Sequence, residues 1–383
     1  MNKIILLAFS TLFLFVACNF RAGNEQSLTV ISEKDVAVND TLIQNIIDTL
    51  SIIPLEETPE CLLGNIKKVQ KANNEFFVMA EGSNRLSAIY RFSSDGKFLN
   101  RIGRLGNARN EYLKIGSFFV LNEKVYIADL NKNKILIYNI DGEFIDSNES
   151  NENIKFLHDM QAIDNDMALF SYNINFSDND ALFEVVDLNS FKVLKTITTT
   201  YKADGSFPYS LKEFAYDGEN ILLSLPFDNN VYKMNKRNFT IEKVMSLGLW
   251  GDIPSFNTND FEEMQETMEE AGTSLLYGLF VSGNKILLNS IQGSILWHKD
   301  SGKGLYLENE IDLNKMKRFP FLPLSVCYSD IEGFYSVFSA DSFTSIVQEK
   351  ELEKKEGVRP QTTINTISDN KNPVIVKYIL KSL

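Results

Sequence analysis

One pattern recurs along almost the whole chain and limits its fold more than any other feature. A short β-rich run that follows a turn occurs six times, at residues 74–82, 123–130, 165–173, 219–227, 284–291 and 332–340. A strand pattern precedes each run, and two further strand patterns follow each run but the last. Turn pairs such as Asp-Gly and Asn-Lys separate the strands, which is typical of antiparallel meanders. Four strands per unit, at a spacing of roughly 40 to 65 residues, predict an all-β fold, a six-bladed β-propeller.

The sixth unit lacks its outer pair of strands locally. Residues 341–355 interrupt it with a helical pattern, and the chain resumes as a strand at 372–380. We expect residues 48–57, near the other end of the chain, to supply the outermost strand of this blade. Such a closure removes a free sheet edge, which gives it a physical reason.

The first residues carry an export signal. Lys3 is followed by an apolar run from Ile4 to Ala17, too short to span a bilayer comfortably and of the proportions of a secretory signal. Phe15 to Cys18 resembles a bacterial lipobox, in which the cysteine is lipidated and becomes the mature N-terminus. The alternative is an ordinary cleaved signal with Cys18 incidental. The predicted organisation is a lipoprotein signal peptide at 1–17, a tether and N-terminal segment at 18–47, and the propeller at 48–383.

Charge and cysteine content limit the partners. The chain carries a net charge of −13, and loss of Lys3 with the signal makes −14. This argues against nucleic acid, which needs a basic footprint, and against a surface lying flat on anionic lipid. Membrane contact is therefore expected through the lipid anchor only. Cys61 and Cys327 remain after Cys18, and two buried free thiols are favoured over a disulfide.

The chain also resembles known proteins. Residues 123–145 look like a blade of the NHL-repeat type. Across almost the whole mature chain the sequence resembles the six-bladed β-propeller lipoproteins of Gram-negative gut anaerobes, a family without assigned activity. The matching segments are the lipobox, 48–56, 102–120 and 372–381. The resemblance implies an envelope protein anchored by lipid, with the periplasmic side of the outer membrane favoured over the cell surface.

Residues 102–116, IGRLGNARNEYLKIG, admit two interpretations. No Lys-Ser/Thr pair follows their glycines, so they are not a phosphate-binding loop. In the favoured interpretation they link blades 1 and 2: Gly103, Gly106 and Gly116 supply unusual φ values, Arg104 or Arg109 pairs with Glu111, and Tyr112 packs on the next blade. In the other, Arg104, Arg109 and Tyr112 bind an anionic or sugar ligand.

The links between blades and the loops after each second strand gather on one face of a propeller. That face would combine charges, amides and exposed aromatic rings, as recognition of a polar ligand requires. The candidate ligand-binding residues are Arg85, Arg104, Arg109, Glu111, Tyr112, Asp129, Asn131, Tyr172 and Asp228. The opposite face carries short hairpins such as Asp95-Gly96 and Asp141-Gly142, which are turns with little reach.

Signals for catalysis are few. Only two histidines exist, so a three-histidine metal site is excluded, although His158 falls on an inner strand from which it could face the channel. No Gly-x-Ser-x-Gly elbow is present. No cofactor is certain, and calcium is a possible one, held by channel-facing oxygens. Its candidate ligands are Asp129, Asn131, Asp178, Asp180, Asp228, Asn229 and Asp341.

Two function classes stay open. The favoured one is a non-enzymatic binding lipoprotein whose partner is an envelope protein, a glycan or a small polar ligand. The alternative is a calcium-assisted hydrolase or lyase with carboxylates in the channel. A capped helix predicted within 258–272 presents Phe261, Met264 and Met268 on one face. Packing of this face on the ring is favoured over docking of a partner.

Overall fold

The computed structural model describes residues 28–38, 45–81, 86–148, 152–172, 181–198, 212–216, 220–225, 228–251, 253–254, 261–308, 320–348 and 371–381. Cys18 and Arg85 lie outside these ranges. Within the described part of the chain, no helix is both long and apolar enough to cross a membrane.

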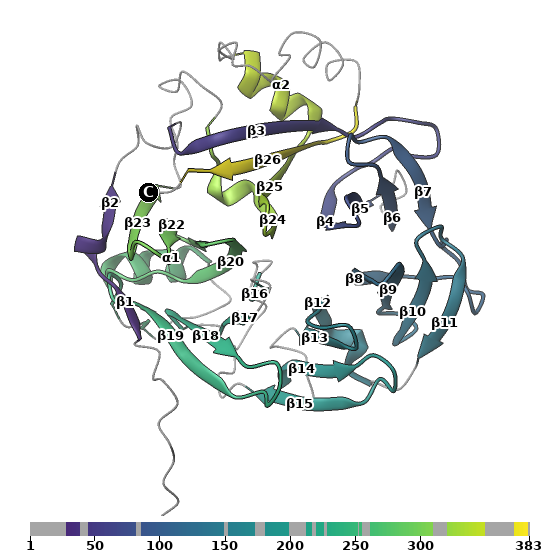
Figure 1. Cartoon of the computed structure of the whole chain (residues 1–383), viewed down its shortest axis with the longest axis horizontal. Helices are drawn as coiled ribbons and strands as arrows, with labels where there is room; N and C mark the ends of the chain where they lie inside the picture. The colour runs from purple at the N-terminus through teal and green to yellow at the C-terminus, as the bar shows by residue number, and fades with distance from the viewer. Residues whose placement is uncertain are drawn as a thin grey trace, which may run out of the picture.

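The described strands form six antiparallel sheets arranged as blades around a central axis (Figure 1), so the predicted six-bladed propeller is confirmed. Each blade runs from an inner strand at the axis to an outer strand at the rim. The first three blades are continuous in sequence. They comprise β4 (Ile66–Ala72), β5 (Glu75–Glu81), β6 (Ser87–Phe92) and β7 (Phe98–Ile102); β8 (Ile115–Leu121), β9 (Lys124–Asp129), β10 (Lys134–Asn139) and β11 (Phe144–Asn148); and β12 (Leu157–Ala162), β13 (Met167–Tyr172), β14 (Ala181–Asp187) and β15 (Val193–Thr198).

Blades 4 and 5 each gain a fifth strand that the sequence did not reveal. Their own strands are β16 (Phe214–Tyr216), β17 (Ile221–Ser224), β18 (Asn230–Met234) and β19 (Ile241–Leu247), then β20 (Leu276–Ser282), β21 (Lys285–Ser290), β22 (Gly293–His298) and β23 (Lys303–Glu308). β1 (Thr29–Ile31) pairs in parallel with β19, and β2 (Val36–Val38) pairs in parallel with β23. The N-terminal segment therefore lies along the rim (Figure 1) and covers two outer edges that would otherwise be open.

Blade 6 closes the ring as predicted. Its strands are β24 (Val326–Asp330), β25 (Gly333–Phe338), β26 (Val374–Leu380) and β3 (Ile47–Pro54). β3 pairs antiparallel with β26 over its whole length, so the two ends of the propeller meet in one sheet. The Asn372 side chain fixes the entry to β26: its amide donates to the carbonyls of Glu56 and Cys61, each at 2.8 Å, and its carbonyl accepts the Leu63 N–H at 2.8 Å.

Apolar residues of the two middle strands of each blade fill the space between adjacent blades. β5, β9 and β21 are almost wholly buried, whereas the outer strand β15 is exposed at five of its six residues. The sequence shows the same decrease in apolar character from the middle strands to the outer strand, with continuous apolar runs in the middle strands. Burial on both faces explains those continuous runs, because each middle strand packs against two neighbouring blades.

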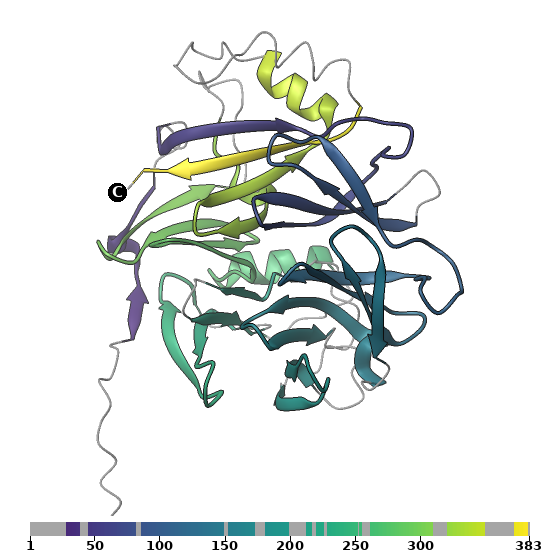
Figure 2. The same ribbon diagram turned by 45° about the vertical axis from the view of Figure 1, so that its right-hand side comes forward.

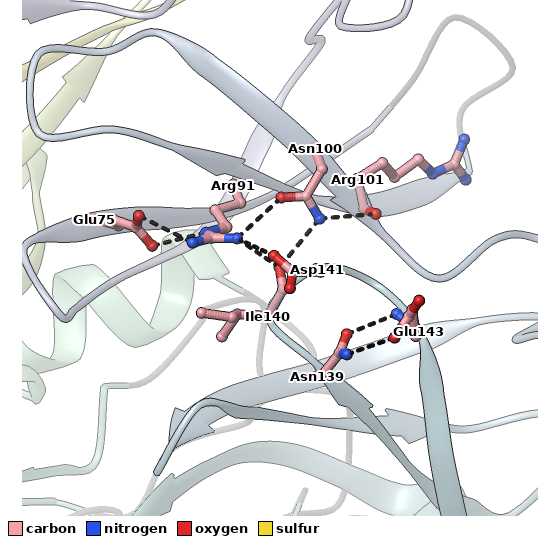
Figure 3. Close-up of polar contacts among 8 residues, drawn as sticks. All are labelled: Glu75, Arg91, Asn100, Arg101, Asn139, Ile140, Asp141 and Glu143. Atoms are coloured by element: carbon pink, nitrogen blue, oxygen red, sulfur yellow. Dashed lines mark hydrogen bonds and ion pairs between the residues drawn. The ribbon is translucent and has the colours of Figure 1, made fainter.

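The Asp-Gly hairpins do more than reverse the chain. Arg91 on β6 donates to both carboxylate oxygens of Glu75, at 2.7 and 3.0 Å, and also to Asp141 of the blade 2 hairpin at 2.9 Å (Figure 3). Gly142 has φ of +88°, and a Cβ there would lie 2.5 Å from the carbonyl oxygen of Arg101 on β7. The prediction of a turn is confirmed. The prediction that the turn has little reach is wrong, because this hairpin packs on the preceding blade.

Two helices lie within the described residues. α1 (Phe261–Glu270) buries Met268 completely, in agreement with packing on the ring; the side chains of Phe261 and Met264 lie outside the described set. α2 (Ala340–Gln348) follows β25 and packs Phe343, Ile346 and Val347 into the core of blade 6. Figure 2 shows α2 outside β3 and β26, at the rim.

Candidate functional site

A cavity of about 740 Å³ occupies the central channel. Inner strands of the blades form its wall, and the segments just before β6 and β8 and just after β9 form its mouth. The polar residues that line it are Lys67, Lys68, Gln70, Glu81, Ser87, Lys114, Asn131, Ser117, His158, Asp159, Gln161, Lys212, Cys327 and Tyr328. His158 lines the channel, so the interpretation of a lone strand histidine as a core residue, which its position on an inner strand favoured, is wrong.

The inner strands share a backbone irregularity that shapes this wall. In β4, β8, β12, β20 and β24 the register slips by one residue near the start of the strand, at Lys67, Gly116, His158, Tyr277 and Cys327. A bulge of this kind breaks the alternation of side chains and turns consecutive residues toward one side. In four of these strands the bulged residue and its successor accordingly both line the channel, as Lys67 and Lys68 do.

A charged cluster crosses the channel between four blades. The Lys68 ammonium donates to Asp159 at 2.5 Å, to the Ser117 hydroxyl at 2.9 Å and to the Met160 carbonyl at 2.8 Å. Lys212 donates to the second Asp159 oxygen at 3.0 Å. Lys68 belongs to blade 1, Ser117 to blade 2 and Asp159 to blade 3, while Lys212 directly precedes the inner strand of blade 4. We call Lys68, Ser117, Asp159 and Lys212 the channel cluster.

Burial and charge oppose each other in this cluster. Burial lowers the pKa of Lys68 to about 8, although Asp159 favours its charged form. Burial disfavours ionisation of Asp159, but Lys212 and Lys68 together hold the pKa of its carboxyl well below the ordinary value. Asp159 is thus a carboxylate shared by two lysines, which leaves an excess of positive charge at this level of the channel.

Glu213 lies next to the cluster and is almost fully buried. Burial, with a smaller contribution from the charge of Asp159, raises the pKa of its carboxyl to about 7, although His158, the Ser171 hydroxyl and Lys212 all act in the opposite direction. Its Oε2 atom has no hydrogen-bond partner among the residues that the structure describes. Burial therefore favours the neutral form of Glu213 far more than in an exposed carboxyl, because a charged group is costly to bury.

Asp129 organises the mouth of the channel. Its buried carboxylate accepts backbone N–H groups from Leu113, Lys114, Asn131 and Lys132, at 2.8 to 3.2 Å. These bonds fix the two segments that present Lys114 and Asn131 to the channel. Of the predicted ligand-binding residues, Asn131 therefore lines the cavity, and Asp129 holds it in place from behind.

The contacts within residues 102–116 are those of a structural turn. Arg104 pairs with Glu111 at 3.2 Å, and Glu111 accepts the Ala108 N–H at 2.9 Å. Lys132 donates to the carbonyls of Gly106, Ala108 and Glu111, which ties the loop to blade 2. Gly103 has φ of +60° as expected, but the expectation is wrong for Gly106 and Gly116, which have no positive φ. A Cβ at Gly106 would lie 2.0 Å from a Glu111 oxygen and would displace the carboxylate that pairs with Arg104.

The aromatic residues expected on this face are buried. Tyr112 has no exposed surface, and its hydroxyl accepts a hydrogen bond from Arg101 at 3.1 Å. Tyr172 is equally buried and donates to Glu184 at 2.7 Å. The expectation that these two rings are exposed for a ligand is wrong, because the adjoining blades need large apolar side chains to fill the space between them. The packing of Tyr112 predicted by the turn interpretation is confirmed.

The other predicted site residues are spread out. Arg109 is exposed on the link but does not line the cavity. Asp228 accepts hydrogen bonds from Asn230 and Tyr232 within blade 4. Among the described residues no group of three or more His, Cys, Asp or Glu side chains is placed to hold a metal ion; Asp178 and Asp180 lie outside them. Cys61 and Cys327 are free thiols, and Cys327 is exposed on the channel wall rather than buried.

Comparison with known proteins supports the architecture. The chain has the fold of a crystal structure of a "putative exported protein" from Bacteroides fragilis NCTC 9343, with a TM-score of 0.67 and 18% identity over 92% of this chain and 100% of that one. A member of the DUF4221 family from Bacteroides vulgatus ATCC 8482 matches with a TM-score of 0.54 and 13% identity, over 88% and 98% of the two chains. No curated protein matches significantly. The model of a domain of unknown function, DUF4934, matches residues 28–378, and the chain belongs to this family.

Proposed function

We propose that this protein is a non-enzymatic envelope component that binds an anionic ligand in the mouth of its central channel. One observation carries the proposal: Lys67, Lys68, Lys114 and Lys212 line a cavity that holds only Glu81 and Asp159 as described acidic residues, in a chain with a net charge of −13. A local excess of one charge, walled by protein, attracts ligands of the opposite charge.

Lys114 is the cation best placed to contact a ligand. It is exposed at the mouth, and its ammonium has no ion pair or hydrogen bond with any described residue. Lys67 is paired with Glu81 at 3.1 Å, and the donors of Lys68 are occupied within the channel cluster. The described channel residues give less support to the calcium-assisted alternative, because their carboxylates are separated or already paired with lysines.

The binding test uses the chain from residue 19 onward and isothermal titration with three anions: decanoate, glucuronate and citrate. At least one should bind, and Lys114→Met should weaken that binding about tenfold at low ionic strength, since a hydrogen bond to a charged group contributes about 1.5 kcal/mol. Raising the salt concentration should weaken it as well. Lys195→Met removes an exposed lysine on β15, far from the channel, and should change nothing. Binding of none of the three anions would overturn the proposal.

We further propose that Cys18 anchors the protein to a membrane, as its lipobox-like context indicates. Acyl chains at Cys18 would bury enough CH₂ groups, at about 0.8 kcal/mol each, to hold a folded domain at a membrane. Cys18→Ala should move the protein from the membrane fraction to the soluble fraction without lowering its melting temperature. Sedimentation of the variant with membranes after a high-salt wash would contradict the anchor.

A further inference from the structure

Three leucines lie at the mouth of the channel, on the side of blades 1 and 2. Leu86 is 42% exposed at the start of β6, and Leu113 and Leu130 are half-buried just before β8 and just after β9. All three line the cavity and come from separate segments of blades 1 and 2. We call Leu86, Leu113 and Leu130 the leucine collar. Apolar side chains beside a channel that is rich in lysine make the site amphipathic.

The backbone is adapted to place Leu130 there. A Cβ at Gly116 would lie 2.4 Å from Cδ2 of Leu130, so Leu130 lies directly over this glycine on β8. Any larger residue at position 116 would displace the leucine. Gly116 is the bulged residue of the inner strand β8. In other inner strands the bulge directs polar side chains into the channel wall, whereas in β8 the bulged glycine makes room for the apolar side chain of Leu130.

The described lining residues offer little aromatic surface on which a sugar ring could stack. The aromatic residues among them are Phe280, which is 4% exposed, and Tyr328, whose hydroxyl donates to the Lys71 carbonyl at 3.3 Å. A hydrophilic anion such as a uronic acid would leave the leucine collar in contact with water. A ligand with an aliphatic part would cover the collar, and this burial is favourable.

We infer that the ligand is an amphiphilic anion, with a carboxylate, sulfate or phosphate group directed to Lys114 and an aliphatic part against the leucine collar. This inference rests on the proposed anion-binding function and specifies its chemical class. The charged group gives orientation, and the apolar contact gives most of the affinity. The expected signature is an affinity that rises with chain length, by about threefold to fourfold per buried methylene.

The test is isothermal titration of the chain from residue 19 onward with butyrate, hexanoate, octanoate and decanoate, and separately with glucuronate. Affinity should rise along the series, and decanoate should bind at least tenfold more tightly than glucuronate. Leu130→Ser and Leu86→Ser should each weaken decanoate binding several-fold and should therefore flatten the rise of affinity from butyrate to decanoate. Leu86 is exposed, so its variant keeps the test valid if Leu130→Ser lowers stability. The matched control is Leu194→Ser, at a 47% exposed leucine on β15, which should not change binding.

A flat dependence on chain length, or glucuronate binding as tight as that of decanoate, would overturn the inference. If glucuronate binds in a manner that depends on Lys114 while decanoate does not bind, the ligand is a hydrophilic anion and the proposed function stands. If no anion binds, both the inference and the proposed function fail.

Discussion

A chain lacking residues 372–383 is expected to fail to form a stable propeller. β26 is the third strand of blade 6 and joins β25 to β3, so its loss leaves β3 without a partner and opens one edge of β25, which keeps only β24. The deletion also removes a set of buried side chains, Val374, Ile375, Val376, Tyr378 and Leu380. Truncation of one large buried side chain typically costs about 2–5 kcal/mol, so the loss of five is comparable with, or larger than, the roughly 5–15 kcal/mol stability of a typical domain.

Circular dichroism melts and size-exclusion chromatography would measure the outcome. We expect aggregation or loss of the cooperative transition. The matched control deletes only residues 382–383, beyond the end of β26, and should melt like the full chain. A cooperative melt of the longer deletion within a few degrees of the full chain would show that the ring does not depend on this closure.

Asp159→Asn is expected to destabilise the protein by about 3–5 kcal/mol at pH 7, the usual cost of removing one partner of a buried ion pair. The variant leaves Lys68 and Lys212 without their shared counter-charge across four blades. The matched control is Asp164→Asn, in the exposed turn after β12, where the aspartate forms a long ion pair of 3.9 Å with Lys236. The free energy of unfolding of this control should lie within about 0.5 kcal/mol of the value for the native protein.

The pH dependence gives a second readout of the same group. The folded-state pKa of Asp159 is lower than its unfolded value near 3.8, so its contribution is present above about pH 4 and is lost as the pH falls below that value. The difference in free energy of unfolding between the native protein and Asp159→Asn should therefore become smaller as the pH is lowered. Urea unfolding at several pH values would measure it. Equal stability of the two proteins at pH 7 would show that the channel cluster does not hold the blades together.

The triple variant Lys68→Met, Asp159→Leu, Lys212→Met should recover much of the stability lost in Asp159→Asn. Replacement of a whole buried ion cluster by apolar groups of similar volume is often neutral or favourable, because it removes the desolvation cost together with the attraction. Failure of the triple variant to melt above Asp159→Asn would mean that the geometry of the cluster, not its charge balance, matters.

Local patterns in the sequence determined the architecture of this protein. Apolar runs in the middle strands, turn residues and the unit spacing predicted six blades, and the incomplete sixth unit predicted its completion by residues 48–57. Local chemistry was also sufficient for Gly103 and for an arginine partner of Glu111, but the choice of Arg104 over Arg109 came from the structure. These features depend on neighbours in the chain or on a repeated hydrophobic pattern, and both can be read directly from residues.

Only the tertiary structure decided which residues meet at the axis. Asp159 contacts Lys68 and Lys212, which are 91 and 53 positions away, and no local pattern links such distant residues. One signal was present: Lys67-Lys68 and His158-Asp159 are consecutive polar pairs near the start of strands that otherwise alternate, and each pair marks a bulge. Tyr112 is a residue whose position the sequence left open. Its polar loop admitted both packing on the next blade and contact with a ligand, and the packing of its aromatic ring between two blades decided for burial.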